Sequence, residues 1–175
     1  MPLGLKRGTV QLNQYSDQWQ KLFDIEKNEI QNVFGDQALA IEHIGSTAIP
    51  GMVAKPILDL MVAVESIDNY ETFTLLLEQL GYTFMHDFRD TQEHILYVKG
   101  PEECRTHYLK LTTVDSGFWK EHILFRDYLI ANPQRAQQYI DLKQELLEKY
   151  ADERSKYTEA KAAFILETLK LTENE

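Results

Sequence analysis

The segment from Ile57 to Val64 is apolar at every position except Asp59. A short apolar run of this kind is typical of a strand that is buried on both faces of a sheet. An unpaired carboxylate is costly to bury, so we expect Asp59 to line a cleft or to have a partner of opposite charge. This single interruption restricts both the fold and the place of a functional site.

The rest of the chain alternates between strand-like and helix-like patterns. The predicted strands are residues 38–44, 57–64, 82–86, 95–99 and 106–114. The predicted helices are residues 17–34, 68–80, a helical region from Ser116 that is broken at Asn132-Pro133, and a final helix that begins at Ser155. This order predicts an α/β (α+β) fold with a mixed β-sheet covered by helices and a helical C-terminal third. Without a linker or repeat, residues 1–175 are expected to form a single domain.

Composition excludes some classes of partner. The net charge of −10 at pH 7 argues against binding to extended nucleic acid or to anionic lipid. The chain has no apolar stretch of the roughly 20 residues that span a bilayer, and Met1 to Val10 lacks a secretory core, so a cytoplasmic protein is expected. Cys104 is the only cysteine, which excludes an intrachain disulfide and a thiolate zinc cluster within one chain.

A Gly-Ser turn precedes the strand that carries Asp59. Gly45 allows close backbone approach, and the hydroxyl of Ser46 and nearby N–H groups can donate to phosphate oxygens. Lys55 adds a cation, and Asp59 can hold Mg²⁺ for displacement at an α-phosphorus. The alternatives are a purely structural turn at Gly45-Ser46 and a solvated Lys55. We take the turn and the carboxylate together as a predicted triphosphate site.

Two neighbouring segments, His43 to Gly51 and Ala54 to Asp59, resemble the signature of GrpB-type proteins. The resemblance continues in Arg105 to His107, Phe125 to Leu129 and Tyr157 to Lys161, and so covers nearly the whole chain from about Val10. It implies a nucleotidyltransferase-like fold with an activity assigned by analogy. Some relatives look fused to a dephospho-coenzyme A kinase, which implies a functional link to coenzyme A biosynthesis.

The sequence departs from the wider nucleotidyltransferase pattern at Met61, where a second metal carboxylate is normally found. Side chains alternate along a strand, so Asp59 and Met61 should share a face and one ligand is missing. His107 and His43 are candidates to replace it, although imidazole suits Mn²⁺ or Zn²⁺ better than Mg²⁺. The predicted metal site is therefore Asp59 with His107 or His43 and Mg²⁺ or Mn²⁺. Structural hydrogen bonding is the alternative for both histidines.

Further residues are predicted to contact phosphate. The complete predicted set for phosphate or nucleotide is Gly45, Ser46, Thr47, Lys55, Arg126 and Lys161. Arg126 interrupts the apolar side of its helix, and Lys161 lies four residues from Tyr157, so both can face a cleft. For Arg126 the alternative is an ion pair with Asp127 or another acid.

Two functions are consistent with these residues. The leading one is metal-dependent transfer of a nucleoside monophosphate from a nucleoside triphosphate to an acceptor, with Asp59 as the catalytic residue. The alternative, favoured by Met61, is a non-catalytic module that binds a nucleotide, a coenzyme A precursor or another phosphorylated small molecule. A protein-interaction adaptor ranks last because the sequence shows no heptad run.

Overall fold

The computed structural model describes residues 3–85 and 93–172. Its centre is a five-stranded sheet in the order β1-β2-β5-β4-β3. The strands are β1 (Ala40–Ile44), β2 (Leu58–Ala63), β3 (Tyr82–Phe84), β4 (His94–Lys99) and β5 (His107–Thr112). β2 and β5 run parallel, and the other neighbouring strands are antiparallel. The predicted α/β class with a mixed sheet is confirmed.

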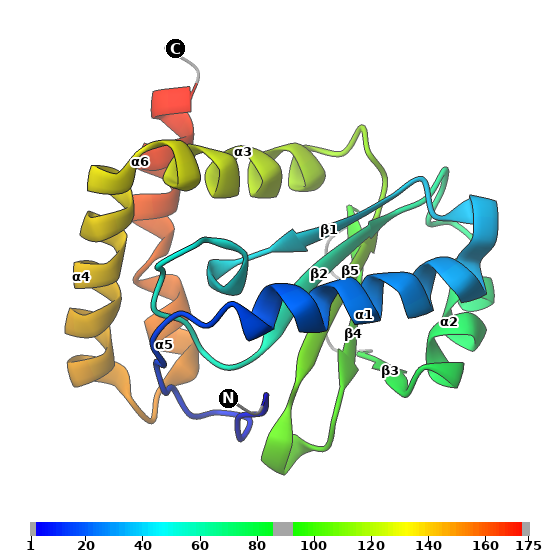
Figure 1. Cartoon of the computed structure of the whole chain (residues 1–175), viewed down its shortest axis with the longest axis horizontal. Coiled ribbons are helices and arrows are strands. Elements are labelled where there is room, and N and C mark those ends of the chain that lie inside the picture. Colours follow the sequence, from blue (N-terminus) through cyan, green and yellow to red (C-terminus); the bar gives the residue numbers. More distant parts are fainter. Residues whose placement is uncertain (1–2, 86–92, 173–175) are drawn as a thin grey trace.

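Helices surround this sheet (Figure 1). They are α1 (Gln18–Phe34), α2 (Tyr70–Gln79), α3 (Gly117–Ala131), α4 (Pro133–Tyr150), α5 (Arg154–Glu159) and α6 (Ala162–Thr172). α1 crosses one face of the sheet, and α4, α5 and α6 stand together beyond one end of β1 and β2. No helix in the described part of the chain is both long and apolar enough to cross a membrane.

The face of the sheet toward α1 carries the main hydrophobic core. Alternation along β2 directs Leu58, Leu60 and Val62 to this face, where all three are fully buried. From α1, Trp19 and Phe23 pack against them, as the helical spacing of these residues predicts. Residues of β2 with odd numbers, Asp59 first among them, must therefore face the other way.

α3 covers part of the opposite face. Its N-cap residue, Ser116, accepts a hydrogen bond from the backbone N–H of Trp119 at 3.0 Å, which satisfies a donor that the first helical turn leaves free. Phe118 of α3 stacks on His94 of β4 with ring centroids 3.9 Å apart. This cover is incomplete, and the remaining space forms a cavity next to Asp59.

The single final helix predicted from Ser155 is divided in the structure, with a turn at Ala160 and Lys161 between α5 and α6. Tyr157 packs in a cluster with Val10 and Leu146, whereas Phe164 packs against a different cluster near Tyr139. Tyr157 and Phe164 are seven residues apart, as are Leu146 and Tyr139 of α4 in the same two clusters, whereas Ala160, which was expected on the same face, is exposed. The end of the strand predicted over 82–86 lies outside the described residues, and the described strand, β3, ends at Phe84.

Candidate functional site

A cavity of about 750 Å³ lies on the sheet face opposite α1. We call it the Asp59 cavity. Its walls come from the centre of the sheet, from the turn after β1, from α3 and α4, and from the region around α5 and the start of α6. Of the predicted phosphate and metal residues, the cavity brings together Gly45, Ser46, Thr47, Lys55, Asp59 and Lys161.

Gly45 and Asp59 lie directly against each other. Ile44 pairs with Asp59 in the antiparallel β1–β2 ladder, so the turn begins beside the carboxylate. Gly45 has φ 70° and ψ −171°, a conformation that is almost restricted to glycine. A Cβ atom at this position would stand 2.9 Å from Oδ2 and 3.1 Å from Cβ of Asp59. Glycine is thus required both by the backbone and by the carboxylate next to it.

Asp59 is ionised and accessible from the cavity. Its side chain is 32% exposed, and its Oδ1 accepts a hydrogen bond from Nζ of Lys110 at 2.9 Å. Burial raises the pKa of this carboxyl, but Lys110, Lys55 and Arg154 outweigh burial and hold the pKa below its usual value. The acid that sequence patterning predicted to need either a cleft or a partner therefore has both.

Basic side chains outnumber acidic ones around the cavity. The cations are Arg7, Lys55, Arg105, Lys110, Lys143, Arg154 and Lys161, and the acids are Asp59, Glu121 and Glu159. This excess occurs in a chain whose net charge is −10. Like charges that line a concave surface with apolar walls concentrate the electrostatic potential there. The cavity therefore concentrates basic side chains in an acidic protein.

Lys143, on α4, is one of the site residues that sequence reasoning missed, together with Lys110 and Arg154. Lys143 is only 2% exposed. Its Nζ donates to the hydroxyl oxygen of Ser46 at 3.1 Å and to the carbonyl oxygen of Val53. A signal was present in the sequence, because Lys143 follows Tyr139 by four residues and precedes Leu146 by three, on the buried face of α4. Burial, followed by repulsion from Lys161 and Lys55, lowers the pKa of Lys143 to about 6.

Lys55 and Lys161 both lie close to the ring of Tyr157. Their Nζ atoms lie 5.8 Å and 4.8 Å from the centroid of that ring. Burial is the main cause that lowers the pKa of Lys55 to about 7 and that of Lys161 to about 8. Arg154, whose guanidinium lies 5.0 Å from the ring centroid of Tyr108, lowers both values further.

The two histidines that were candidates to complete a metal site are not brought together with Asp59. Leu60 pairs with His43, and Leu58 pairs with His107. Since Asp59 lies between these two leucines in β2, its side chain points to the opposite face of the sheet. The ring of His43 instead stacks on Phe23 with centroids 4.7 Å apart.

Both histidines have structural partners. Nε2 of His43 lies 2.9 Å from Oγ1 of Thr47, and Nδ1 of His107 lies 2.9 Å from Oγ1 of Thr106. Nε2 of His107 is 3.7 Å from Glu26, too far for a hydrogen bond, and Lys99 already donates to both oxygens of that carboxylate at 2.8 and 3.0 Å. Burial therefore dominates and lowers the pKa of His43 and of His107 to about 4.

Arg126 forms the ion pair that was its alternative interpretation. It donates to Glu42 at 2.6 Å, to the carbonyl oxygen of His43 at 2.8 Å and to Asp127 at 2.7 Å, and it does not line the Asp59 cavity. These contacts attach α3 to β1. The expected phosphate contact of Arg126 is replaced by this structural role.

The place of a second carboxylate is apolar. Met61 is fully buried, and its pairing partners in the neighbouring strands are Glu42 and Lys110. Within the described ranges there is no cluster of three or more metal-ligating side chains of His, Cys, Asp or Glu. In the described part of the chain, Asp59 is therefore not accompanied by two further side chains of these types.

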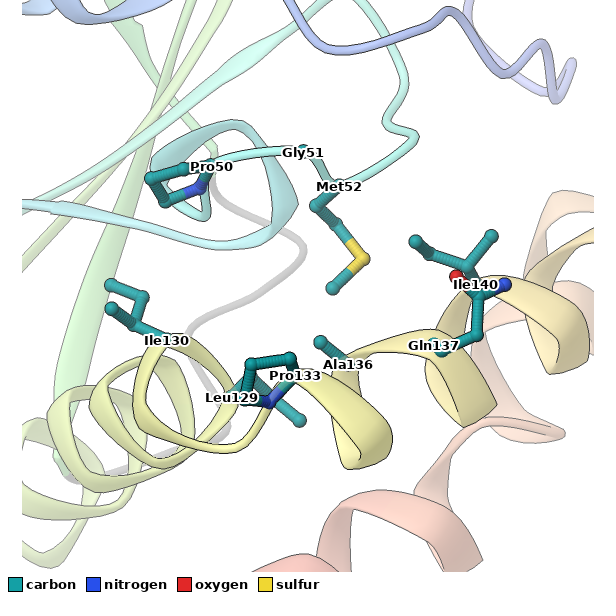
Figure 2. A pocket seen from close by; sticks show the side chains of 9 residues that line it. All are labelled: Pro50, Gly51, Met52, Leu129, Ile130, Pro133, Ala136, Gln137 and Ile140. Carbon is teal, nitrogen blue, oxygen red and sulfur yellow. The ribbon is translucent and has the colours of Figure 1, made fainter.

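A second, smaller pocket of about 240 Å³ lies outside the sheet (Figure 2). Pro50, Gly51 and Met52 form one side of it, and the ends of α3 and α4 form the other. Among the described residues that line it, none is charged. In this it differs from the Asp59 cavity, which is lined by several lysines and arginines.

The fold and this cavity define a class: α+β proteins in which a glycine turn and a sheet carboxylate open into a cation-lined pocket. The chain belongs to the GrpB family, because residues 9–171 match the family model described as GrpB protein. It is 39% identical to the glutamate-rich protein GrpB of Alkalihalophilus pseudofirmus over 170 residues, 95% of this chain and 98% of that protein.

Two further comparisons agree with this assignment. The UPF0157 protein YqkA of Bacillus subtilis is 35% identical over 89% of this chain, which spans 45% of that longer protein. The crystal structure of conserved protein GrpB from Enterococcus faecalis superposes with a TM-score of 0.83 at 32% identity, covering 93% of this chain and 96% of that one.

Proposed function

We propose that this chain binds a phosphorylated small molecule of nucleotide size in the Asp59 cavity. The observation that carries the proposal is the excess of cations around a pocket that contains one ionised, accessible carboxylate. Lys55, Lys143 and Lys161 are half-buried or buried there, and they repel one another and Arg154. A bound phosphate group would offset this repulsion with charge-assisted hydrogen bonds.

The size and lining of the cavity fit a nucleotide. Pockets for ligands of this size typically measure about 300–1,000 Å³, and this one measures about 750 Å³. Apolar and aromatic side chains, among them Leu96, Val98 and Tyr108, line the part formed by β4 and β5. Such a surface suits a base or another weakly polar group, while the lysines suit the phosphates.

Nucleotidyl transfer is the second candidate, favoured by the ionised Asp59 beside Gly45. It would place the chain among nucleotidyltransferase-like proteins. Mg²⁺ or Mn²⁺ would reach Asp59 as a complex with the triphosphate, where such an ion offsets phosphate charge and orients an attacking hydroxyl. The residues of this chain would hold the phosphates with Ser46 and Lys143 and keep Asp59 ionised through Lys110.

Binding is tested by isothermal calorimetry with ATP, GTP, CTP, UTP and dephospho-coenzyme A, each with and without Mg²⁺. Adenosine is the matched control ligand, because it has the base but no phosphate. We expect at least one phosphorylated ligand to bind and adenosine to fail. At about 100 times its Kd a ligand should raise the free energy of unfolding by about 2.7 kcal/mol. The proposal is wrong if none of these ligands binds or shifts the melting temperature.

The site is tested with Arg154→Met, which removes a cation that lines the cavity. Loss of a charge-assisted contact worth about 1.5–3 kcal/mol should weaken binding about tenfold or more. Lys156→Met is the matched control, since this lysine lies on the same helix, pairs with Glu153 and is exposed. Equal effects of the two variants would place the ligand elsewhere.

Transfer is tested separately by pyrophosphate release from labelled nucleoside triphosphates with Mg²⁺ or Mn²⁺ and a metabolite extract as the source of acceptors. We expect Asp59→Asn to abolish release while it retains binding of the same nucleotide. If the wild-type protein binds the nucleotide but releases no pyrophosphate that depends on Asp59, the non-catalytic binding function stands and transfer is excluded.

A further inference from the structure

Three lysines from separate parts of the chain meet at the Asp59 cavity. Lys55 lies in the loop before β2, Lys143 lies on α4, and Lys161 lies at the junction of α5 and α6. We call them the lysine trio. Lys55 is far from the other two lysines in the sequence, so only the tertiary structure brings all three together. Lys161 lies in the turn between α5 and α6 and lines the cavity.

The contacts of the trio do not neutralise its charge. In residues 3–85 and 93–172, none of the three amines has a carboxylate oxygen within 4.0 Å. Lys143 uses neutral oxygens of Ser46 and Val53, and its Nζ lies 4.7 Å from the ring centroid of Tyr139. By contrast, the half-buried cations Lys99, Lys110, Arg126 and Arg135 each have a carboxylate partner.

The surrounding charged groups leave the trio short of negative charge. Asp59 favours the charged forms of Lys55 and Lys161, but its carboxylate is already bound by Lys110. Arg154 and Lys110 oppose the charging of both lysines. The phenols that pack against the trio, Tyr139 and Tyr157, stay neutral because burial raises their pKa values.

We propose that the lysine trio is the subsite for a phosphate group with at least two negative charges, and that the trio takes up protons from solvent when this group binds. The inference rests on the proposed function and adds a substrate class to it: a phosphomonoester or polyphosphate end rather than a phosphodiester. A dianion supplies the charge that the cavity lacks, and a single charge does so only in part.

Proton linkage follows from the charges of the free cavity. The pKa of Lys143 is about 6 and that of Lys55 about 7, because both amines are buried and near other cations. An adjacent phosphate favours the ammonium form and raises these values. Between the free and the bound pKa the complex therefore holds more protons than the free protein. Affinity should fall as pH rises through that window, by at most about tenfold per pH unit for each proton taken up.

The experiment is calorimetric titration of the full chain with ATP at pH 8.0, in two buffers with different heats of ionisation. At this pH the phosphate, whose last pKa is about 6, has lost its proton, so an uptake signal comes from the protein. We expect net uptake near one proton per ATP and an affinity that falls from pH 7.5 to pH 9. Cyclic AMP, a phosphodiester with one charge, should bind at least tenfold more weakly than AMP.

Lys143→Met is the test variant, because methionine fills a similar volume without an amine. It should lower ATP affinity about tenfold or more and reduce the proton uptake. Lys149→Met is the matched control on the same helix, since Lys149 is exposed and pairs with Glu145, and it should change neither quantity. Lys161→Met serves as a second variant if Lys143→Met does not fold by circular dichroism.

The outcomes separate this inference from the proposed function. If ATP binds but proton uptake is absent, or if it persists unchanged in Lys143→Met and Lys161→Met, the trio is not the phosphate subsite and the proposed function stands. If AMP and cyclic AMP bind equally, the preference for a dianion is wrong. If no phosphorylated ligand binds the wild-type protein, both proposals are overturned.

Discussion

The two faces of the central sheet are built from the same strands, and they treat charge in opposite ways. On the face toward α1, the buried Glu26 accepts hydrogen bonds from Lys99 at 2.8 and 3.0 Å. On the face toward α3, Asp59 has one partner, Lys110, while the lysine trio has no carboxylate among the described residues. One face therefore neutralises its charges inside the protein, and the other leaves positive charge without a counterpart.

This difference shows that a buried charged residue can either stabilise the fold or mark a binding site. Which of the two applies depends on whether the residue has a partner of opposite charge. A buried ion pair with good geometry is compatible with a closed core. Several buried amines without a partner destabilise the free protein, because their charged forms are disfavoured relative to the unfolded chain. We infer that the α1 face stabilises the fold and that the α3 face is shaped by a ligand.

The largest effect is expected from Leu60→Ala on the α1 face. Leu60 is fully buried in the main core, and removal of a buried leucine side chain typically costs about 2–5 kcal/mol. ATP affinity should stay within about twofold at temperatures where the variant is folded, since Leu60 points away from the cavity. Urea denaturation and calorimetry measure the two quantities. Lost affinity with unchanged stability would contradict the division between the faces.

A smaller effect on stability is expected when low pH protonates His43, which lies on the α1 face. The pKa of His43 is lowered from 6.5 to about 4 in the folded protein, mainly by burial. The unfolded chain binds the proton first, so this group's contribution to stability is complete above pH 6.5 and is lost as pH falls toward 4. The full shift corresponds to about 3 kcal/mol.

The measurement is the free energy of unfolding in urea between pH 7 and pH 4. His43→Gln, which keeps a hydrogen-bonding group near Thr47, should reduce the slope below pH 6.5 even if it lowers stability at every pH. Carboxylates titrate in the wild-type protein and in the variant alike, so their contributions cancel when the two curves are compared. Parallel curves for the two proteins would show that His43 does not hold a depressed pKa.

The sequence predicts the α1 face and much of the cavity because both follow from local periodicity. The helical spacing in α1 and the apolar run around Asp59 predicted the core, and the Gly45-Ser46 turn was correctly expected beside Asp59. Chain direction and short connections determine such relations between neighbouring segments. Lys55 was predicted near the turn for the same reason, since it lies just before β2.

The residues that were misassigned depend on register and on packing between distant elements. His107 was a candidate ligand on the condition that its strand adjoins that of Asp59. β5 does adjoin β2, but the pairing of Leu58 with His107 sends the imidazole to the other face. A shift of one residue reverses every side chain, and sequence periodicity does not give the register between β2 and β5. Arg126 forms an ion pair with Glu42, which lies 84 residues away in the chain. Lys143 was overlooked because lysine on a helix is usually exposed.

The smallest effect, and the sharpest test of the cavity face, is expected from Gly45→Ala compared with Gly51→Ala. Both glycines have positive φ, 70° and 77°, so an alanine is strained at either position, at a cost of about 1–3 kcal/mol. A Cβ at Gly51 meets no atom within 4 Å, whereas one at Gly45 stands 2.9 Å from the Asp59 carboxylate.

Gly45→Ala should therefore lose at least as much stability in urea as Gly51→Ala, and only Gly45→Ala should displace Asp59 from Lys110 and alter ATP affinity. A change of about threefold or more in Kd for Gly45→Ala, against less than twofold for Gly51→Ala, is the expected result. If both variants bind ATP as the wild-type protein does, the contact between the turn and Asp59 only supports the backbone. The turn would then belong to the structural part of the protein, and the ligand site would be limited to the lysines of α4 and of the α5–α6 junction.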